Sequence, residues 1–289
     1  MSMMLHRAGI MSAPLFRGLL DLYPGAAAAY SLRALSASFL NQPIIRVRRS
    51  SDNTESDFTA AQITDGTLTT WTGANDGFVR TWYDQSGNAR NAEQTTAGSQ
   101  PQIVSSGSLV TDGGLPAVRY NGTSTGFRTA SFAWGSDQME SFGAIKTATN
   151  APAKMIFELS DNLNSNNGAF FFLQNATTSV RFQCQSKGTS STGVLENSQL
   201  LDPPLKVLYN TRSQISTPAI NSFYNGIESS STASQGSGNY GDHPLNIGAR
   251  ENASRLFFDG IMHEAIFYNS LKSDRADIRA NINVAWGGF

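Results

Sequence analysis

Cysteine and histidine are scarce in this sequence, and their scarcity excludes two kinds of site. Cys184 is the only cysteine, so no intrachain disulfide can form, and its alternating surroundings predict a buried or half-buried strand position. The three histidines, His6, His243 and His263, lie far apart and have no cysteine partners, which argues against a zinc site. We expect no metal and no cofactor, and the sequence leaves calcium open without indicating it.

Charge is also low. Only 15% of residues are charged and the net charge is −1, while Ser, Thr, Asn, Gly and Gln are abundant. Soluble domains typically contain about 25% charged residues. This balance gives no electrostatic reason to expect nucleic acid or an acidic membrane as a partner. A polar, uncharged surface suits secreted proteins, virion proteins and sugar-binding surfaces.

Long apolar runs are missing as well, so we expect no transmembrane segment. The N-terminal stretch MSMMLHRAGIMSAPLF is interrupted by His6 and Arg7 and lacks the apolar core of a signal peptide. We interpret residues 1–24 as an arm that anchors the protein to a neighbour, and residues 25–289 as one domain. The apolar arm also favours a homo-oligomer.

Short alternating segments dominate the rest of the chain, and polar turns rich in Gly, Asn, Ser, Thr and Pro separate them. This pattern predicts an all-β fold, an antiparallel β-sandwich. Two helices are expected in addition. AAAAYSLRAL (26–35) follows Pro24 and Gly25 and is rich in strong helix formers. SDRADIRANINVAW (273–286) has Ser273 as its expected N-cap and ends at a glycine pair.

The stretch TWYDQSGNARNAEQ (81–94) concentrates polar side chains after a strand. A calcium loop needs several acids, and this cluster contains Asp84 alone. Asp and Asn side chains bond nearby backbone, and Gly and Asn accept positive φ. We therefore predict that Asp84, Ser86, Gly87 and Asn88 form a structural turn.

Candidate site residues lie near other strand ends. Glycoside hydrolysis needs two facing carboxylates, and the candidates are Glu158, Asp161, Asp242 and Glu251. A glycan-binding surface would use Asp161, Glu251 and the neighbouring Asn162. Trp134 and Tyr240, and Tyr224 as well, are expected in or near loops where they can stack on sugar rings.

The expected last strand contains a histidine and a glutamate side by side, which raises the question of whether they form a functional site. His263 and Glu264 are adjacent, so on a regular strand they face opposite sides and cannot form one site. We expect Glu264 to pair with an arginine on its own face of the sheet.

Several of these segments resemble a known family. YSLRAL (30–35), IRVRRSSDN (45–53), FVRTWYDQSGNARNAEQTT (78–96) and PAVRYNG (116–122) resemble the catalytic domain of fungal and bacterial α-L-arabinofuranosidase B. The region from PLNIGAR (244–250) to the C-terminal helix resembles concanavalin A-like, laminin-G-like jelly-roll domains. Both resemblances imply two antiparallel sheets packed face to face.

The family's catalytic residues match this sequence poorly. The resemblance implies a nucleophilic glutamate at the end of a Phe-Asp-Tyr-Gly-Asn-Ala-Glu segment, where an ungapped match places Leu163. It implies an acid/base aspartate after Ile-Gly-Gly, where this chain has Arg250. Leucine cannot attack an anomeric carbon, and arginine cannot donate a proton at neutral pH. Small shifts would bring Asp161 and Glu251 to these positions.

The mismatch leads to two hypotheses. LLDLYPGAAAAYSLR (19–33) is similar to bacteriophage tail and virion-surface proteins. With no catalytic pair expected, we favour a non-enzymatic virion structural protein: a capsid decoration, head-fibre or tail-associated component assembled in the host cytoplasm. Its partners would be other virion proteins and, for lectin-like outer loops, host surface glycans. The alternative is a retaining glycosidase of α-L-arabinofuranosidase type, with Asp161 and Glu251 about 5–5.5 Å apart.

Overall fold

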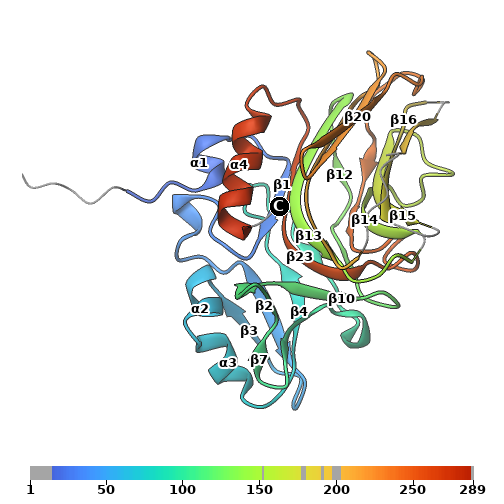
Figure 1. The fold of residues 1–289 in the computed structure, drawn as a ribbon. Helices are drawn as coiled ribbons and strands as arrows, with labels where there is room; N and C mark the ends of the chain where they lie inside the picture. Colours follow the sequence, from blue (N-terminus) through green and yellow to red (C-terminus); the bar gives the residue numbers. More distant parts are fainter. Residues whose placement is uncertain (1–14, 152, 177–179, 190–191, 197–202, 288–289) are drawn as a thin grey trace, which may run out of the picture.

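Most of the chain forms two layers of antiparallel strands packed face to face (Figure 1). The computed structural model describes residues 15–151, 153–176, 180–189, 192–196 and 203–287. One layer has the order β20 (Ile227–Ser231), β19 (Ala219–Tyr224), β18 (Leu205–Gln214), β13 (Gln138–Thr147) and β23 (Asp259–Tyr268). The other layer has the order β17 (Thr192–Glu196), β16 (Val180–Lys187), β15 (Ala169–Ala176), β14 (Lys154–Leu159), β22 (Leu245–Ile247) and β11 (Phe127–Arg128). The predicted all-β, antiparallel sandwich is therefore confirmed.

A smaller group of strands continues from the sandwich. It contains β2 (Ile45–Arg49), β3 (Glu55–Phe58), β4 (Gly77–Trp82), β5 (Ala92–Glu93), β6 (Gln102–Ser105) and β7 (Ser108–Leu109). Helices α2 (Ala60–Thr64) and α3 (Thr67–Thr72) accompany these strands (Figure 1). The link to the sandwich runs through β10 (Val118–Asn121), which pairs with β6 and with β23, and through β5, which pairs with β11. Four short strands and two 3-10 turns complete this part of the chain: β8 (Thr111–Asp112), β9 (Leu115–Pro116), β12 (Phe132–Ala133), β21 (Asp242–His243), Ala37–Phe39 and Ala97–Ser99. Strand β1 and helices α1 and α4 are described below.

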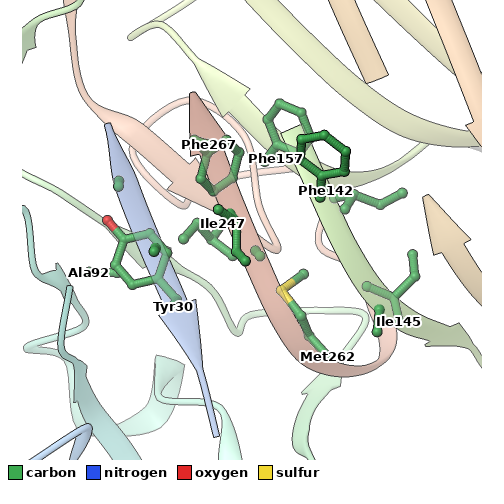
Figure 2. Packing of buried hydrophobic residues seen from close by; sticks show 14 of the residues in the cluster. Tyr30, Ala92, Phe142, Ile145, Phe157, Ile247, Met262 and Phe267 are labelled. Carbon is green, nitrogen blue, oxygen red and sulfur yellow. The ribbon is translucent and has the colours of Figure 1, made fainter. Parts of the chain in front are cut away.

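Aromatic side chains fill the space between the layers (Figure 2). Phe157 of β14 meets Phe267 of β23 edge-on at 4.9 Å between ring centroids, and both rings are buried. Alternate residues of each strand point inward because the side-chain period of a strand is two. Each buried phenylalanine contributes roughly 1.5–3 kcal/mol through the area it removes from water.

The segment 26–35 is not the helix that its composition predicts. Ala28–Ser31 form strand β1, which pairs antiparallel with β23 over Ala28↔Phe267 to Ser31↔Glu264. All four residues of β1 are buried. Helix propensity is a weak preference, and pairing with a buried strand outweighs it here. The short N-terminal helix lies earlier, at α1 (Leu19–Leu22).

The chain before residue 25 is already attached to the sandwich where it is described. Leu19 is buried, the Leu20 amide donates to the Leu35 carbonyl at 2.7 Å, and the Tyr268 hydroxyl donates to the Tyr23 carbonyl at 2.7 Å. Residues 1–14, the rest of the expected arm, lie outside the described residues. Within the described residues, none of the helices combines the length and apolar character needed to cross a membrane.

Helix α4 (Arg275–Trp286) closes the chain against the outer side of β13 and β18. Ile278, Ile282 and Trp286 recur every four residues and are its buried stripe. The helix ends at Gly287, whose φ of 63° favours glycine. Asp274, rather than the expected Ser273, occupies the N-cap position.

His263 and Glu264 both contact Trp286 of this helix, contrary to the expectation that they face opposite sides. The pairing of β13 with β23 shifts register between Ala144 and Ile145, so His263 occupies a β-bulge. A bulge adds one residue to a strand and re-aims the side chains next to it. The His263 ring stacks on Trp286 at 4.8 Å, and Trp286 Nε1 donates to Glu264 at 3.1 Å.

Glu264 is the buried carboxylate that holds these elements together. It accepts hydrogen bonds from Ser31 Oγ at 2.7 Å and from Arg33 Nε at 2.8 Å, in addition to Trp286. The expected pairing of Glu264 with an arginine is thus confirmed, and the partner is Arg33.

Removing this carboxylate is expected to destabilise the fold strongly. Glu264→Ala leaves Arg33 and Trp286 without their acceptor, and breaking such a buried pair costs roughly 3 kcal/mol or more. Glu228→Ala is the control, because Glu228 pairs with Arg279 at 3.1 Å but is 69% exposed, and exposed pairs contribute about 0–1 kcal/mol. Urea unfolding of both variants measures the difference, and equal losses of stability would contradict this role.

His263 makes the stability depend on pH. Its Nδ1 donates to the Pro116 carbonyl at 2.7 Å, and burial lowers the pKa of the ring while Asp112 and Glu264 oppose this effect. The unfolded state therefore binds more protons, so the free energy of unfolding falls as pH drops below about 6.5. The stability advantage of the native protein over His263→Asn should shrink between pH 7.5 and pH 5, and parallel stability curves would rule this out.

Candidate functional site

Glu158 lies at the centre of the candidate site, near the end of β14. Its neighbours Phe157 and Leu159 point into the sandwich core, so the strand alternation turns Glu158 to the outer face. The side chain is still completely buried, because a second small apolar cluster covers this face. The cluster consists of Met155, Leu163, Ala169, Phe171 and Leu173, with Leu256 packed against it.

Four donors converge on the Glu158 carboxylate. Its Oε1 accepts from Ser160 Oγ at 2.8 Å, from the Leu163 amide at 3.2 Å and from Arg250 Nε at 3.2 Å. Its Oε2 accepts from the Glu251 amide at 3.0 Å. Glu158 thereby fixes the loop after β14 to the loop after β22. It acts on the site through other residues, as a positioning group.

The loop after β22 has an unusual backbone. Glu251, Asn252 and Ala253 are consecutive non-glycine residues in the left-handed region, with φ of 51°, 60° and 54°. Each such residue costs about 1–2 kcal/mol, so surrounding contacts must hold the turn. The Arg250 amide donates to the Arg255 carbonyl at 2.9 Å, and the bond from the Glu251 amide to Glu158 completes the fixation.

Two further carboxylates lie beside Glu158. The Asp161 side chain is 46% exposed and accepts from Arg128 Nη2 at 2.6 Å. The Glu251 side chain is 13% exposed and pairs with Arg255 at 2.9 Å. Arg250 Nε lies 3.2 Å from Glu158 Oε1 and 3.6 Å from Glu251 Oε1, so the guanidinium group lies between these two carboxylates.

Unpaired polar atoms gather around the same carboxylates. Among the described residues, buried atoms without a hydrogen-bond partner include Arg128 Nε, Asn246 Oδ1, Arg250 Nη2 and Glu251 Oε1. Asn246 is directly opposite Glu158 in the pairing of β14 with β22. Buried polar groups are normally satisfied. Two of these atoms are donors, on Arg128 and Arg250, and two are acceptors, on Asn246 and Glu251.

An open groove with a volume of about 750 Å³ begins at these loops. Its wall includes Arg90, Glu93, Gln94, Arg128, Phe132 and Asn252. Arg128 connects the groove to Asp161, and Asn252 connects it to Glu251. The groove therefore adjoins the two loops that carry Asp161 and Glu251.

The segment 84–88 forms the turn at the end of this groove. Asp84 is buried and accepts from the amides of Ala29, Ser86 and Arg90 at 2.9 Å each. Asn88 Nδ2 donates to the Ala27 carbonyl at 3.1 Å, and Gly87 has a φ of 89°. These contacts fasten the turn to the chain before β1.

Trp134 and Tyr240 cannot serve as the sugar-stacking residues that we expected. Both are buried, at 1% and 2% exposure, and their rings meet edge-on at 6.3 Å. Trp134 Nε1 donates to the Gln138 carbonyl, and burial raises the pKa of the Tyr240 hydroxyl, which bonds Ser186. Tyr224 is buried too. These aromatic rings are core residues, and no local sequence pattern indicates how deeply a side chain is buried.

Asn162 and Asp242 are placed differently from Asp161. Asn162 Oδ1 accepts from the Asn164 amide at 3.0 Å, so its side chain closes the loop after β14. Asp242 is exposed on β21, opposite Ala133. It belongs to another ladder than Glu158.

Sequence reasoning missed Arg128 and Asn246. Arg128 reaches Asp161 from a strand 33 residues earlier in the chain. Asn246 Nδ2 donates to the Ser160 carbonyl at 2.8 Å from the opposite strand. Only the order of strands in the sheet brings these residues to Glu158, and no local motif marks them.

Comparison of the whole chain with known proteins finds similarity among solved structures. No protein family model matches the chain, and no curated protein matches it. A crystal structure of an arabinofuranosidase complexed with arabinofuranosyl-α-1,2-xylobiose covers 93% of this chain, with a TM-score of 0.69 and 18% identity. A mutant GH54 α-L-arabinofuranosidase soaked with 4-nitrophenyl α-L-arabinofuranoside gives 0.68, again at 18% identity. The chain spans 65% of the length of each, and the likeness establishes a shared sandwich fold.

These comparisons overturn the virion hypothesis. Nearly the whole chain superposes on glycosidases, and neither the comparisons nor the structure link it to a bacteriophage, a capsid or a tail. The anchoring role of residues 1–24 stays a prediction, because residues 1–14 lie outside the described part of the chain. The glycoside hydrolase alternative agrees better with the fold.

The Glu158–Arg250 pair is expected to support the site's loops. Arg250→Met removes one of the donors to a fully buried carboxylate, and we expect a loss of roughly 3–5 kcal/mol in the free energy of unfolding. Arg255→Met is the matched control, because the Arg255 side chain is 61% exposed and its loss should cost under about 1 kcal/mol. Chemical denaturation measures the free energy of unfolding of both variants. An Arg250→Met variant as stable as the native protein would contradict the role of the Glu158–Arg250 pair in holding the loops.

Proposed function

We propose that the protein is a glycoside hydrolase acting on glycans that carry α-L-arabinofuranosyl or closely related residues. One observation carries the proposal: Asp161 and Glu251 adjoin residues of a polar groove, Asp161 through its ion pair with Arg128 and Glu251 as the neighbour of Asn252, in a chain of which 93% superposes on arabinofuranosidases. The groove offers amide, hydroxyl and arginine donors, which suit sugar hydroxyl groups.

Hydrolysis of a glycoside needs two carboxylates with different tasks. One protonates the departing oxygen, and the other attacks the anomeric carbon or activates water. Glu158 is completely buried and enclosed by its four donors, whereas the side chains of Asp161 and Glu251 are 46% and 13% exposed. Glu251 Oε1 is buried and makes no hydrogen bond among the described residues. We assign Asp161 and Glu251 as the catalytic pair and Glu158 as the residue that positions Glu251.

Sugar binding without hydrolysis is the second candidate, and Arg250 is the observation that favours it. The resemblance to α-L-arabinofuranosidase B implies an acid/base aspartate at this place. Arg250 instead forms an ion pair with Glu158, and an arginine does not release a proton near neutral pH. If Glu251 does not take over the acid/base task, the groove binds glycans and leaves them intact.

Sugar release decides between the two candidates. The purified protein should hydrolyse 4-nitrophenyl α-L-arabinofuranoside, measured as nitrophenolate release. Asp161→Asn and Glu251→Gln should each lower kcat by about 10²–10⁴. Asp242→Asn is the control, because Asp242 is an exposed acid on another strand pair, and it should leave kcat unchanged.

Two results would contradict the proposal. No release by the native protein would favour binding alone, and full activity in both variants would remove Asp161 and Glu251 from the mechanism. Circular dichroism of each variant checks that the loss of activity does not come from unfolding.

A further inference from the structure

Three hollows adjoin one another along the turn of residues 84–91. The first has about 170 Å³ and the second about 540 Å³, and Ser38, Phe39 and Gly87 line both. The third is the groove of about 750 Å³ beside the loops of Asp161 and Glu251, and Ala89 and Asn91 line it together with the second hollow. Neighbouring hollows thus share lining residues, and we call the three together the 84–91 trough.

The backbone at Gly87 lines the trough and is held in place by neighbouring side chains. At Gly87, φ is 89° and a side chain would meet nothing within 4 Å, so the backbone itself faces the open space. The buried Asp84 carboxylate and the Asn88 amide hold this backbone in place. A surface that is already fixed loses little entropy when a ligand binds to it.

The walls combine aromatic and neutral polar side chains. Phe39 and Tyr83 line the second hollow with Gln42, which is exposed, and Phe132 lines the third. The Tyr83 hydroxyl donates to Asp57 at 2.8 Å, and burial together with this bond raises its pKa to about 12, so the ring stays uncharged. Such rings offer an apolar face to a sugar ring, while amides and hydroxyls meet its hydroxyl groups.

The charged side chains that line the trough balance one another, with Arg90 and Arg128 opposed by Glu93 and the buried Asp84. Glu93 pairs with Arg80 at 3.3 Å, and Arg128 pairs with Asp161 at 2.6 Å. Arg90 donates to the Ala27 carbonyl at 2.9 Å and lies 4.0 Å over the Phe132 ring. No excess of positive charge remains to attract an acidic polysaccharide, so the lining suits a neutral chain.

We infer that the 84–91 trough binds an extended neutral polysaccharide, with the chain running from the carboxylates at the Asn252 end, past Gly87, to Phe39. This inference rests on the proposed function only for the end at which cleavage occurs. It makes the substrate class a polymer that occupies several sites, in contrast to a short glycoside that occupies one.

Affinity as a function of chain length tests the inference. We would measure binding of arabinan and arabinoxylan oligosaccharides of two to six units by calorimetry, and of both soluble polysaccharides by affinity electrophoresis. Affinity of the native protein should rise with length. Phe39→Ala should weaken binding of the longest oligosaccharides by about three- to tenfold.

Two more variants separate binding from folding. Gln42 is exposed, so Gln42→Ala should reduce the gain from chain length without affecting the fold. Phe223→Ala is the matched control, because Phe223 is also half-buried but lies outside the trough, under Arg279. It should bind every chain like the native protein.

Three results would overturn the inference: equal affinity for all lengths, equal weakening by Phe39→Ala and Phe223→Ala, or no binding of either polysaccharide. Hydrolysis of 4-nitrophenyl α-L-arabinofuranoside is scored separately. Length-dependent binding without hydrolysis would support polysaccharide binding in the trough and contradict the proposed hydrolase activity. Hydrolysis without length-dependent binding would support the hydrolase activity and contradict polysaccharide binding in the trough.

Discussion

The arrangement of the candidate site depends on one buried carboxylate, Glu158. A charge without exposure to water is tolerated only when donors surround it, and Glu158 has four. Two of these donors come from the loop after β14 and two from the loop after β22. Since those loops also carry Asp161 and Glu251, the contacts of Glu158 help to set where both acids lie.

The left-handed turn at residues 251–253 shows what this fixation achieves. Three strained residues in succession store several kcal/mol by the usual estimate of about 1–2 kcal/mol each. The turn keeps Asn252 on the groove wall and Glu251 against Arg250. Strain of this kind persists where surrounding contacts over-determine the backbone, and such places are frequently binding sites. Structure and proposed function therefore point to the same loop.

Sequence patterns predicted the sandwich and the buried strand position of Cys184 because both follow from local alternation. They failed where a distant partner decided the outcome. Ala28–Ser31 have helical composition but pair with β23, and His263 and Glu264 share one side because of a bulge defined by β13. Trp134 and Tyr240 stand among turn residues in the sequence, yet the ladder of β12 with β21 covers that region.

Local sequence patterns predicted even less of the candidate site. Asp161 and Glu251 could be suggested from the sequence, but the contacts of Arg128 with Asp161 and of Arg250 with Glu158 could not, because each joins segments that lie far apart in the chain. The resemblance to arabinofuranosidases made Arg250 look like the loss of a catalytic aspartate. In the structure the same arginine lies between two glutamates, at 3.2 Å from one and 3.6 Å from the other. A residue that cannot donate a proton can still position a neighbouring carboxylate. The departure from the family pattern thus moves the question from Arg250 to Glu251, the acid whose amide is bound by Glu158 and whose carboxylate lies beside Arg250.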